Sequence, residues 1–157
     1  MLVRRMTIAD YGEVYRLWRG SGGMGLRPLD DTREGIAKFL ERNPHSCFVA
    51  EAGRGNSCGG GNGGAGARGI AGVILSGHDG RRGYIYHAAV REDCRGMGAG
   101  TALVAAVEDA MKKEGINKIA LVAFASNAAG NDFWEKKGYA ARGDLVYRNK
   151  SLNEKNE

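Results

Sequence analysis

Residues 84–104 read YIYHAAVREDCRGMGAGTALV, in which a strand pattern, a glycine-rich turn and a helix pattern follow one another. Tyr84 to Val90 is an apolar run typical of a strand, and apolar residues recur at helical spacing from about Gly98 to Lys113. The turn between them, Arg95 to Gly100, is rich in glycine. Such a turn before a helix presents unpaired backbone N–H groups and the positive end of the helix dipole, and it lets an anion approach closely. The stretch therefore predicts a phosphate- or pyrophosphate-binding site.

The spacing of these glycines excludes two other phosphate loops. A Walker-type loop needs a lysine between its last glycine and the Ser/Thr, but Gly100 and Thr101 are adjacent. The dinucleotide fingerprint needs a third glycine where Thr101 stands. A Gly-x-Gly-x-x-Gly match also occurs inside the glycine tract 53–69, but no helix pattern follows it, and we attribute it to chance. The pattern that remains is Arg-x-x-Gly-x-Gly, from Arg95 to Gly100.

With the strand before it and the helix after it, this pattern resembles the acyl-CoA loop of the GNAT superfamily of N-acetyltransferases. A second segment, Asn127 to Tyr139 (NAAGNDFWEKKGY), is similar to the family's later asparagine, short helix and Gly-aromatic run. The segments 77–83 and 144–148 resemble a bacterial branch of small members, and the likeness covers residues 2–150. It implies an acetyl-CoA-dependent N-acetyltransferase, in which a primary amine attacks the thioester directly in a ternary complex and no metal takes part.

The resemblance implies which residues hold acetyl-CoA. Backbone N–H groups of the loop would bind the pyrophosphate, and Arg95 would add a charge-assisted contact. The backbone of residues 88–90 would align the pantetheine arm and polarise the thioester carbonyl. Asn127 matches an asparagine that contacts the pantetheine arm, although an asparagine after a strand is also a common helix cap. The cofactor-binding residues expected are Ala88, Ala89, Val90, Arg95, Gly96, Met97, Gly98, Ala99, Gly100, Asn127 and Trp134.

Trp134 departs from the resembled family, in which many members have a tyrosine at this place as the general acid toward the leaving thiolate. An indole N–H has no useful acidity, so Trp134 would pack beside the thioester or fill the core. The thiolate does not strictly need an acid, because thiols are weakly basic compared with alcohols and amines.

The general base has no carboxylate candidate on the strands where family members often place one. The strand before the loop offers Tyr84, Tyr86 and His87, and the run 118–124 contains no acidic residue. A histidine can accept a proton near neutral pH, so His87 is the first catalytic candidate and Tyr84 the second. A purely structural histidine stays open as the alternative. Tyr86 and Tyr147 are candidates for the substrate pocket.

Composition favours one domain with an anionic partner. The chain has 157 residues, a net charge of +5 and a pI near 9.2. The charge suits polyanionic CoA, or it is an ordinary solvated surface. A nucleic-acid partner is disfavoured, because basic residues form no run longer than two and no stripe interleaved with aromatic residues. No apolar run is long enough to span a membrane and the N-terminus does not resemble a signal peptide, so we expect a cytoplasmic protein.

The cysteines are odd in number and widely spaced, at Cys47, Cys58 and Cys94. This spacing favours reduced thiols in the cytoplasm, and without a Cys-x-x-Cys pair it gives no indication of zinc. Cys94 lies beside the loop, where a thiolate would be stabilised, but no matched Cys-His-Asp arrangement supports a covalent acyl-cysteine mechanism.

The order of elements predicts an α/β fold: a single domain over residues 1–150, with a mixed central sheet of about six to seven strands flanked by about four helices. Asp31 with Glu34 has the spacing of a cap for the second helix. The tract 53–69 is expected to be a flexible loop between two strands, and residues 151–157 a polar tail. Strands are expected at 2–6, 47–52, 70–76, 84–90, 119–124 and 145–148. Helices are expected around 8–18, between the cap at Asp31 and a stop at Asn43-Pro44, and around 98–113 and 129–137.

A second function class stays open from the sequence. An acyl-CoA-binding or sensing module with little catalysis is the alternative, because the usual tyrosine is replaced by Trp134 and no carboxylate base is evident. For the enzyme, the partner would be an amine-bearing small molecule or a protein or peptide acceptor. A homodimer is also left open, since members of the resembled family commonly pair.

Overall fold

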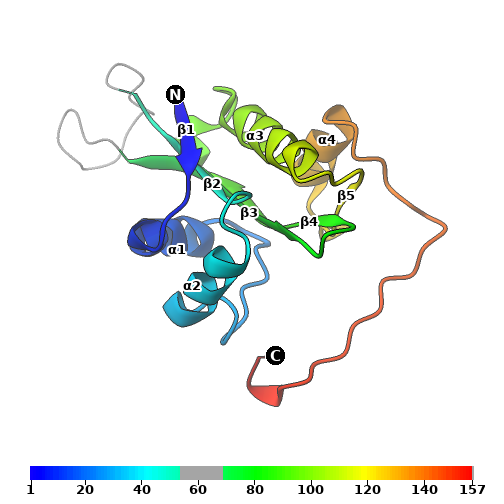
Figure 1. The fold of residues 1–157 in the computed structure, drawn as a ribbon. Coiled ribbons are helices and arrows are strands. Elements are labelled where there is room, and N and C mark those ends of the chain that lie inside the picture. The colour runs from blue at the N-terminus through cyan, green and yellow to red at the C-terminus, as the bar shows by residue number, and fades with distance from the viewer. Residues whose placement is uncertain (54–68, 157) are drawn as a thin grey trace.

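The computed structural model describes residues 1–53 and 69–156, and in these residues five strands form one mixed sheet (Figure 1). The first four strands pair antiparallel with their neighbours, and the last pairs parallel with the fourth. A parallel pair needs a long crossover connection, which a helix supplies here. In spatial order, which is also chain order, the strands are β1 (Leu2–Arg5), β2 (Phe48–Glu51), β3 (Ile70–His78), β4 (Gly83–Val90) and β5 (Ile119–Leu121).

Helices cover both faces of the sheet (Figure 1). The first two lie on one face, where Val14 and Trp18 are fully buried. The other two lie on the opposite face, where Leu103, Val107 and Met111 are buried against the sheet. Burying a side chain of this size contributes about 1.5–3 kcal/mol, so each face holds its own part of the core. The helices are α1 (Tyr11–Gly20), α2 (Arg33–Arg42), α3 (Ala99–Lys113) and α4 (Ala128–Lys136), and a 3₁₀ turn, Ile8–Asp10, precedes α1.

α3 has the length and the buried face that its sequence predicts. Leu103, Val104, Val107 and Met111 are all buried, as residues spaced three and four apart on one helix face should be. The chain leaves α3 through Gly115, whose φ of 73° lies in the left-handed region that favours glycine. The crossover between β4 and β5 is therefore specified by local sequence at both of its ends.

The start of α2 differs from the prediction. Thr32, and not Asp31, is the N-cap, and its Oγ1 accepts a hydrogen bond from Gly35 N at 3.0 Å. The capping role predicted for Asp31 is therefore wrong, and its carboxylate is left for a partner outside the helix.

The expectation of six to seven strands is also wrong, because the sheet of the described residues has five. The run 119–124 forms only the three-residue β5, and Val122 and Phe124 beyond it are 53% and 57% exposed. The expected strand 145–148 does not form, and Leu145, Val146 and Tyr147 are exposed. A strand needs a neighbour to satisfy its backbone groups, and the chain after α4 runs away from the edge of the sheet (Figure 1).

The C-terminal turn returns to the start of α2. Residues Glu154–Asn156 form a 3₁₀ turn, from which Asn156 Nδ2 donates a hydrogen bond to Asp30 Oδ2 at 2.6 Å. The loop predicted over 53–69 lies outside the described residues apart from its two ends. Within residues 1–53 and 69–156, no helix combines the length and the apolar character needed to cross a bilayer.

Candidate active site

β4 and β5 separate after a short paired stretch, and a cleft opens at this place. The two strands pair only where Gly83–Ile85 lies beside Ile119–Leu121. Residues 86–90 of β4 therefore have no strand neighbour on this side in the described structure. The cleft has a volume of about 1520 Å³ and is lined by residues from both faces of the sheet.

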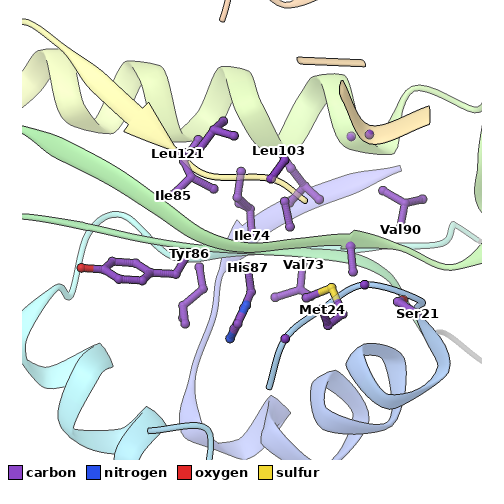
Figure 2. A pocket seen from close by; sticks show the side chains of 18 of the residues that line it. Ser21, Met24, Val73, Ile74, Ile85, Tyr86, His87, Val90, Leu103 and Leu121 are labelled. Carbon is purple, nitrogen blue, oxygen red and sulfur yellow. The ribbon is translucent and has the colours of Figure 1, made fainter. Parts of the chain in front are cut away.

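Figure 2 shows the cleft from close by. Leu103 and Leu121 line it on the side of α3, and His87 and Met24 line it on the side of α1 and α2. One continuous cleft therefore joins the two faces across the open edge of β4.

An extra residue in β4 aims two consecutive side chains at the same face. The pairing of β3 with β4 shifts between His87 and Ile85, so Tyr86 is the extra residue of a bulge. The centroid of the Tyr86 ring lies 5.3 Å from that of Phe39 in α2, and the centroid of the His87 ring lies 5.0 Å from that of Trp18 in α1. Without the bulge, two successive side chains would point to opposite faces.

The glycine turn before α3 has the backbone of an anion site. Gly96 and Gly98 have φ values of 74° and 86°, which favour glycine. The first hydrogen bond of the helix runs from Ala102 N to Gly98 O at 3.0 Å, so the N–H groups of residues 99–101 have no acceptor within the helix. The first turn of α3 carries no acidic side chain that would oppose an anion.

Most of the residues expected to hold the cofactor line the cleft. The exception is Met97, which is 41% exposed and lies outside the lining. Arg95 Nε lies 3.4 Å from Val90 O and donates a hydrogen bond to it, so the guanidinium group sits at the open edge of β4. The members that line the cleft are Ala88, Ala89, Val90, Arg95, Gly96, Gly98, Ala99, Gly100, Asn127 and Trp134.

Asn127 caps α4 and also lines the cleft. Its Oδ1 accepts a hydrogen bond from Gly130 N at 3.0 Å, which is the capping alternative predicted for it. No described residue forms a hydrogen bond with its Nδ2. The side-chain oxygen of Asn127 thus caps α4, and the N–H groups of its side-chain amide are available to a ligand.

Trp134 packs in an aromatic cluster at the wall of the cleft. Its ring lies edge-to-face with Phe133 and Tyr139, at centroid distances of 5.1 and 5.3 Å. Tyr139 cannot take over as the general acid, because it does not line the cleft and its hydroxyl donates to Glu108 Oε1 at 3.2 Å. Burial, together with the Glu108 carboxylate, also raises the pKa of Tyr139 well above its ordinary value.

Tyr84 and Tyr86 line the cleft as protonated phenols. Burial raises the pKa of each above its ordinary value, with smaller contributions from the negative forms of neighbouring groups. Tyr147, from the segment after α4, lines the cleft near them. At neutral pH these phenols are hydrogen-bond donors, and a base has to come from another side chain.

His87 forms a pair with Asp31 on the face of α1 and α2. His87 Nε2 lies 2.8 Å from Asp31 Oδ1, and the two side chains are only 12% and 5% exposed. Sequence reasoning missed Asp31 as a site residue, since its spacing to Glu34 fits a capping box. The two partners are 56 residues apart in the chain, and no local pattern predicts their contact.

Neither Cys47 nor Cys94, the cysteines of the described residues, is a nucleophile of this cleft. Cys94 lines it but is disulfide-bonded, so the prediction of a reduced thiol is wrong for this residue. Cys47 is free and buried, and burial raises the pKa of its thiol to about 12, which keeps it protonated. Cys58 lies outside the described residues.

Charged side chains also line the cleft on the side of α2, and the sequence pattern does not predict them. The charged lining residues of this side are Arg27, Asp30, Asp31, Lys38 and Arg42.

Within the described part of the chain, no group of three or more His, Cys, Asp or Glu side chains is arranged to hold a metal ion.

Comparison with known proteins places this architecture among acetyltransferases. The model of the Acetyltransferase (GNAT) family matches residues 12–139. The chain is 30% identical to Acetyltransferase SG1711 of Sodalis glossinidius over 157 residues, which is all of this chain and 99% of the relative.

Solved structures share the fold at lower identity. Rv2747 from Mycobacterium tuberculosis, in complex with CoA, superposes with a TM-score of 0.64 at 17% identity, over 88% of this chain and 70% of that one. The aminoglycoside acetyltransferase meta-AAC0020 from an uncultured soil sample, in complex with sisomicin, gives a TM-score of 0.68 at 19% identity, over 97% and 96% of the two chains.

Proposed function

The chain belongs to the acetyltransferase (GNAT) family and is an N-acetyltransferase, and from this premise we propose that it moves the acetyl group of acetyl-CoA to a primary amine by direct attack in a ternary complex. The observation that carries the proposal is the single cleft, which joins the glycine turn before α3 to His87 across the open edge of β4. Acetyl-CoA would enter from the α3 side and the amine from the side of α1 and α2. Holding both at once removes the need for an acyl-enzyme.

On the α3 side, this chain would hold acetyl-CoA mainly by its backbone. The free N–H groups of residues 99–101 would bind the pyrophosphate at the helix N-terminus. Asn127 Nδ2 and the backbone of residues 88–90, which has no strand neighbour on this side in the described structure, would contact the pantetheine arm and the thioester carbonyl. N–H donors at that edge stabilise the negative charge that develops on the carbonyl oxygen, so this edge would supply the electrostatic part of catalysis.

In the transfer itself, the amine nitrogen forms a bond to the carbonyl carbon and the carbon–sulfur bond breaks. The products are an amide and the thiolate of CoA. The proton that the amine loses passes to His87, which as general base would contribute roughly 10²- to 10⁴-fold to the rate. The indole N–H of Trp134 is not acidic enough to protonate the leaving group, so the thiolate leaves as an anion and takes its proton from water.

Tyr84 has a supporting role in this proposal. Because burial raises the pKa of its phenol, Tyr84 stays protonated at neutral pH. It would donate a hydrogen bond to the acceptor or to an ordered water beside His87, and it would not remove the amine proton.

The proposal is tested with a thiol-release assay, in which acetyl-CoA is mixed with a panel of amines, amino acids, aminoglycosides and peptides. CoA binding is measured in parallel by calorimetry. We expect thiol release above the hydrolysis background with one class of acceptor. Absence of CoA binding at millimolar ligand would overturn the proposal. Tight CoA binding with no release across the whole panel would favour the alternative, an acyl-CoA-binding module.

A further inference from the structure

Asp31 is the one acidic side chain among the described residues that is buried, with 4% of its surface exposed. Burying a carboxylate is costly unless its oxygens are paired. Both oxygens have a partner here: Oδ1 lies 2.8 Å from His87 Nε2, and Oδ2 accepts a hydrogen bond from Arg27 N at 2.6 Å. The carboxylate is thus held from two fixed directions.

The turn that carries Asp31 is itself rigidly built. Asp31 N donates to Arg27 O at 3.2 Å, and the Tyr11 hydroxyl donates to Asp31 O at 3.0 Å. A Cβ at Gly35 would lie 2.3 Å from Asp30 O, so the first turn of α2 packs directly on the backbone of this turn. The backbone of Asp31 is therefore fixed by contacts that do not involve His87.

The His87 ring is held on one side and open on the other. The ring of Trp18, which is fully buried, packs against it at a centroid distance of 5.0 Å and an angle of 59°. Among the described residues, the imidazole forms one hydrogen bond, through Nε2. Trp18 Nε1 is the single side-chain nitrogen or oxygen of these residues that is buried from solvent and has no hydrogen-bond partner. His87 Nδ1 thus has no hydrogen-bond partner among the described residues and is not buried from solvent, and His87 lines the cleft.

We propose that Asp31 is a positioning residue for acetyl transfer: it fixes the tautomer and orientation of His87 so that Nδ1 carries the lone pair on the side of the cleft. An ionised carboxylate accepts hydrogen bonds and donates none, so the nitrogen facing it, Nε2, carries the proton of the neutral ring. The other nitrogen is then the acceptor. The tautomer of His87 follows from its contact with Asp31 alone. That Nδ1 accepts the proton of the amine rests on the proposed function.

Asp31→Asn tests this arrangement with little change of shape. The amide has one acceptor oxygen, whereas the backbone N–H of Arg27 and Nε2–H of His87 both require an acceptor. Because the backbone N–H cannot be moved, the oxygen should face Arg27 and the NH₂ group should face His87. The imidazole must then accept at Nε2 and carry its proton on Nδ1, which removes the lone pair from the cleft.

The tautomer is read directly from long-range ¹H–¹⁵N correlation spectra of ¹⁵N-labelled protein, at a pH where the ring is neutral. The chain has three histidines, and the His87 signals are assigned by their absence in His87→Gln. We expect the proton on Nε2 in the native protein and on Nδ1 in Asp31→Asn. A native His87 protonated on Nδ1 overturns the proposal, and this measurement needs no variant of Asp31 to fold.

The kinetic part separates positioning from stability. With an acceptor from the panel, Asp31→Asn should lower kcat by roughly 10²-fold or more while KM for the acceptor and CoA affinity stay unchanged. The matched control is Asp10→Asn, which removes another paired carboxylate, at Arg4, outside the cleft lining. It should leave kcat unchanged. An unaltered tautomer and kcat in Asp31→Asn refute the inference. A protein with no turnover on any amine contradicts the proposed function, and the spectra still decide the role of Asp31.

Discussion

The two faces of the sheet line the same cleft, but they are built in different ways. On the α3 face, the groups suited to an anion lie within the seven residues 95–101 and are mostly backbone N–H groups. On the face of α1 and α2, the buried pair of Asp31 and His87 joins positions 56 residues apart in the sequence, through side chains alone. The first face depends on backbone conformation and the second on the chemistry of two side chains. Cofactor affinity and turnover should therefore respond to different kinds of substitution.

The largest effect is expected from His87→Gln on the side-chain face. Glutamine can still donate a hydrogen bond to Asp31, but it has no basic nitrogen. We expect turnover to fall roughly 10²- to 10⁴-fold while CoA affinity stays unchanged, measured by thiol release and calorimetry. The matched control is His78→Gln, at the end of β3 and outside the cleft lining, which should keep full turnover. Equal turnover in the two variants would show that His87 is only structural.

On the backbone face, Gly98→Val should act mainly on the cofactor. A β-branched residue is strained at a φ of 86°, and its side chain would hold an anion away from the N–H groups. We expect CoA affinity to fall about tenfold or more and the free energy of unfolding to fall by about 1–3 kcal/mol.

The control for this variant is Gly115→Val, which introduces similar strain at a φ of 73° beyond the other end of α3. Chemical denaturation should show a comparable loss of stability, and calorimetry should show unchanged CoA affinity. If both variants bind CoA equally, the glycine turn is not the anion site.

Trp134→Tyr tests whether a general acid on the α4 side of the cleft would raise the rate of turnover. The smaller ring loses part of the edge-to-face packing with Phe133 and Tyr139, so we expect stability to fall by about 1 kcal/mol. Turnover should not rise, because a thiolate leaves without protonation. A clear gain in kcat would mean that protonation of the leaving group limits the rate, and the division of labour between the two faces would need revision.

The smallest effect is expected from Asp10→Asn, which sets the baseline for losing a carboxylate outside the cleft. Hydrogen bonds from Arg4, and from the backbone N–H of Thr7, hold the pKa of Asp10 below its ordinary value of 3.8. The ion pair therefore stabilises the fold at neutral pH, and this contribution is lost as the pH falls below about 4.

Because Arg4 is partly exposed to solvent, we expect a loss of about 1 kcal/mol or less at pH 7. Urea denaturation at pH 7 and pH 3 measures it, and the difference between native protein and variant should shrink at pH 3. A difference that grows on acidification would contradict the depressed pKa of Asp10.

Much of the α3 face was predicted from the sequence, since its features are local. The apolar spacing of Leu103, Val107 and Met111 predicts both the helix and its buried side. The glycines at 96 and 98 predict a turn with positive φ, which the structure has. The same pattern places Met97 in the site with its neighbours, but Met97 lies outside the cleft lining, because a backbone pattern says little about where one side chain in a turn is directed.

The other face could be predicted only in part. The chemistry of the imidazole points to His87, but the sequence pattern assigns its partner Asp31 to a helix cap, a role that Thr32 fills in the structure. The number of strands was overestimated in the same way, because the apolar run 119–124 predicts a strand without saying whether a neighbour is present to pair with it.

The sequence alone was enough to identify the family, the helix α3 and the glycine turn before it, because spacing and glycine content act over a few residues. The folded structure was needed to show that β4 and β5 separate, that a bulge turns Tyr86 and His87 to one face, and that a buried carboxylate meets the imidazole there. These features depend on how the chain closes over distances of tens of residues. Hydrogen-bond pairing and burial select among the many long-range contacts that the same local pattern allows.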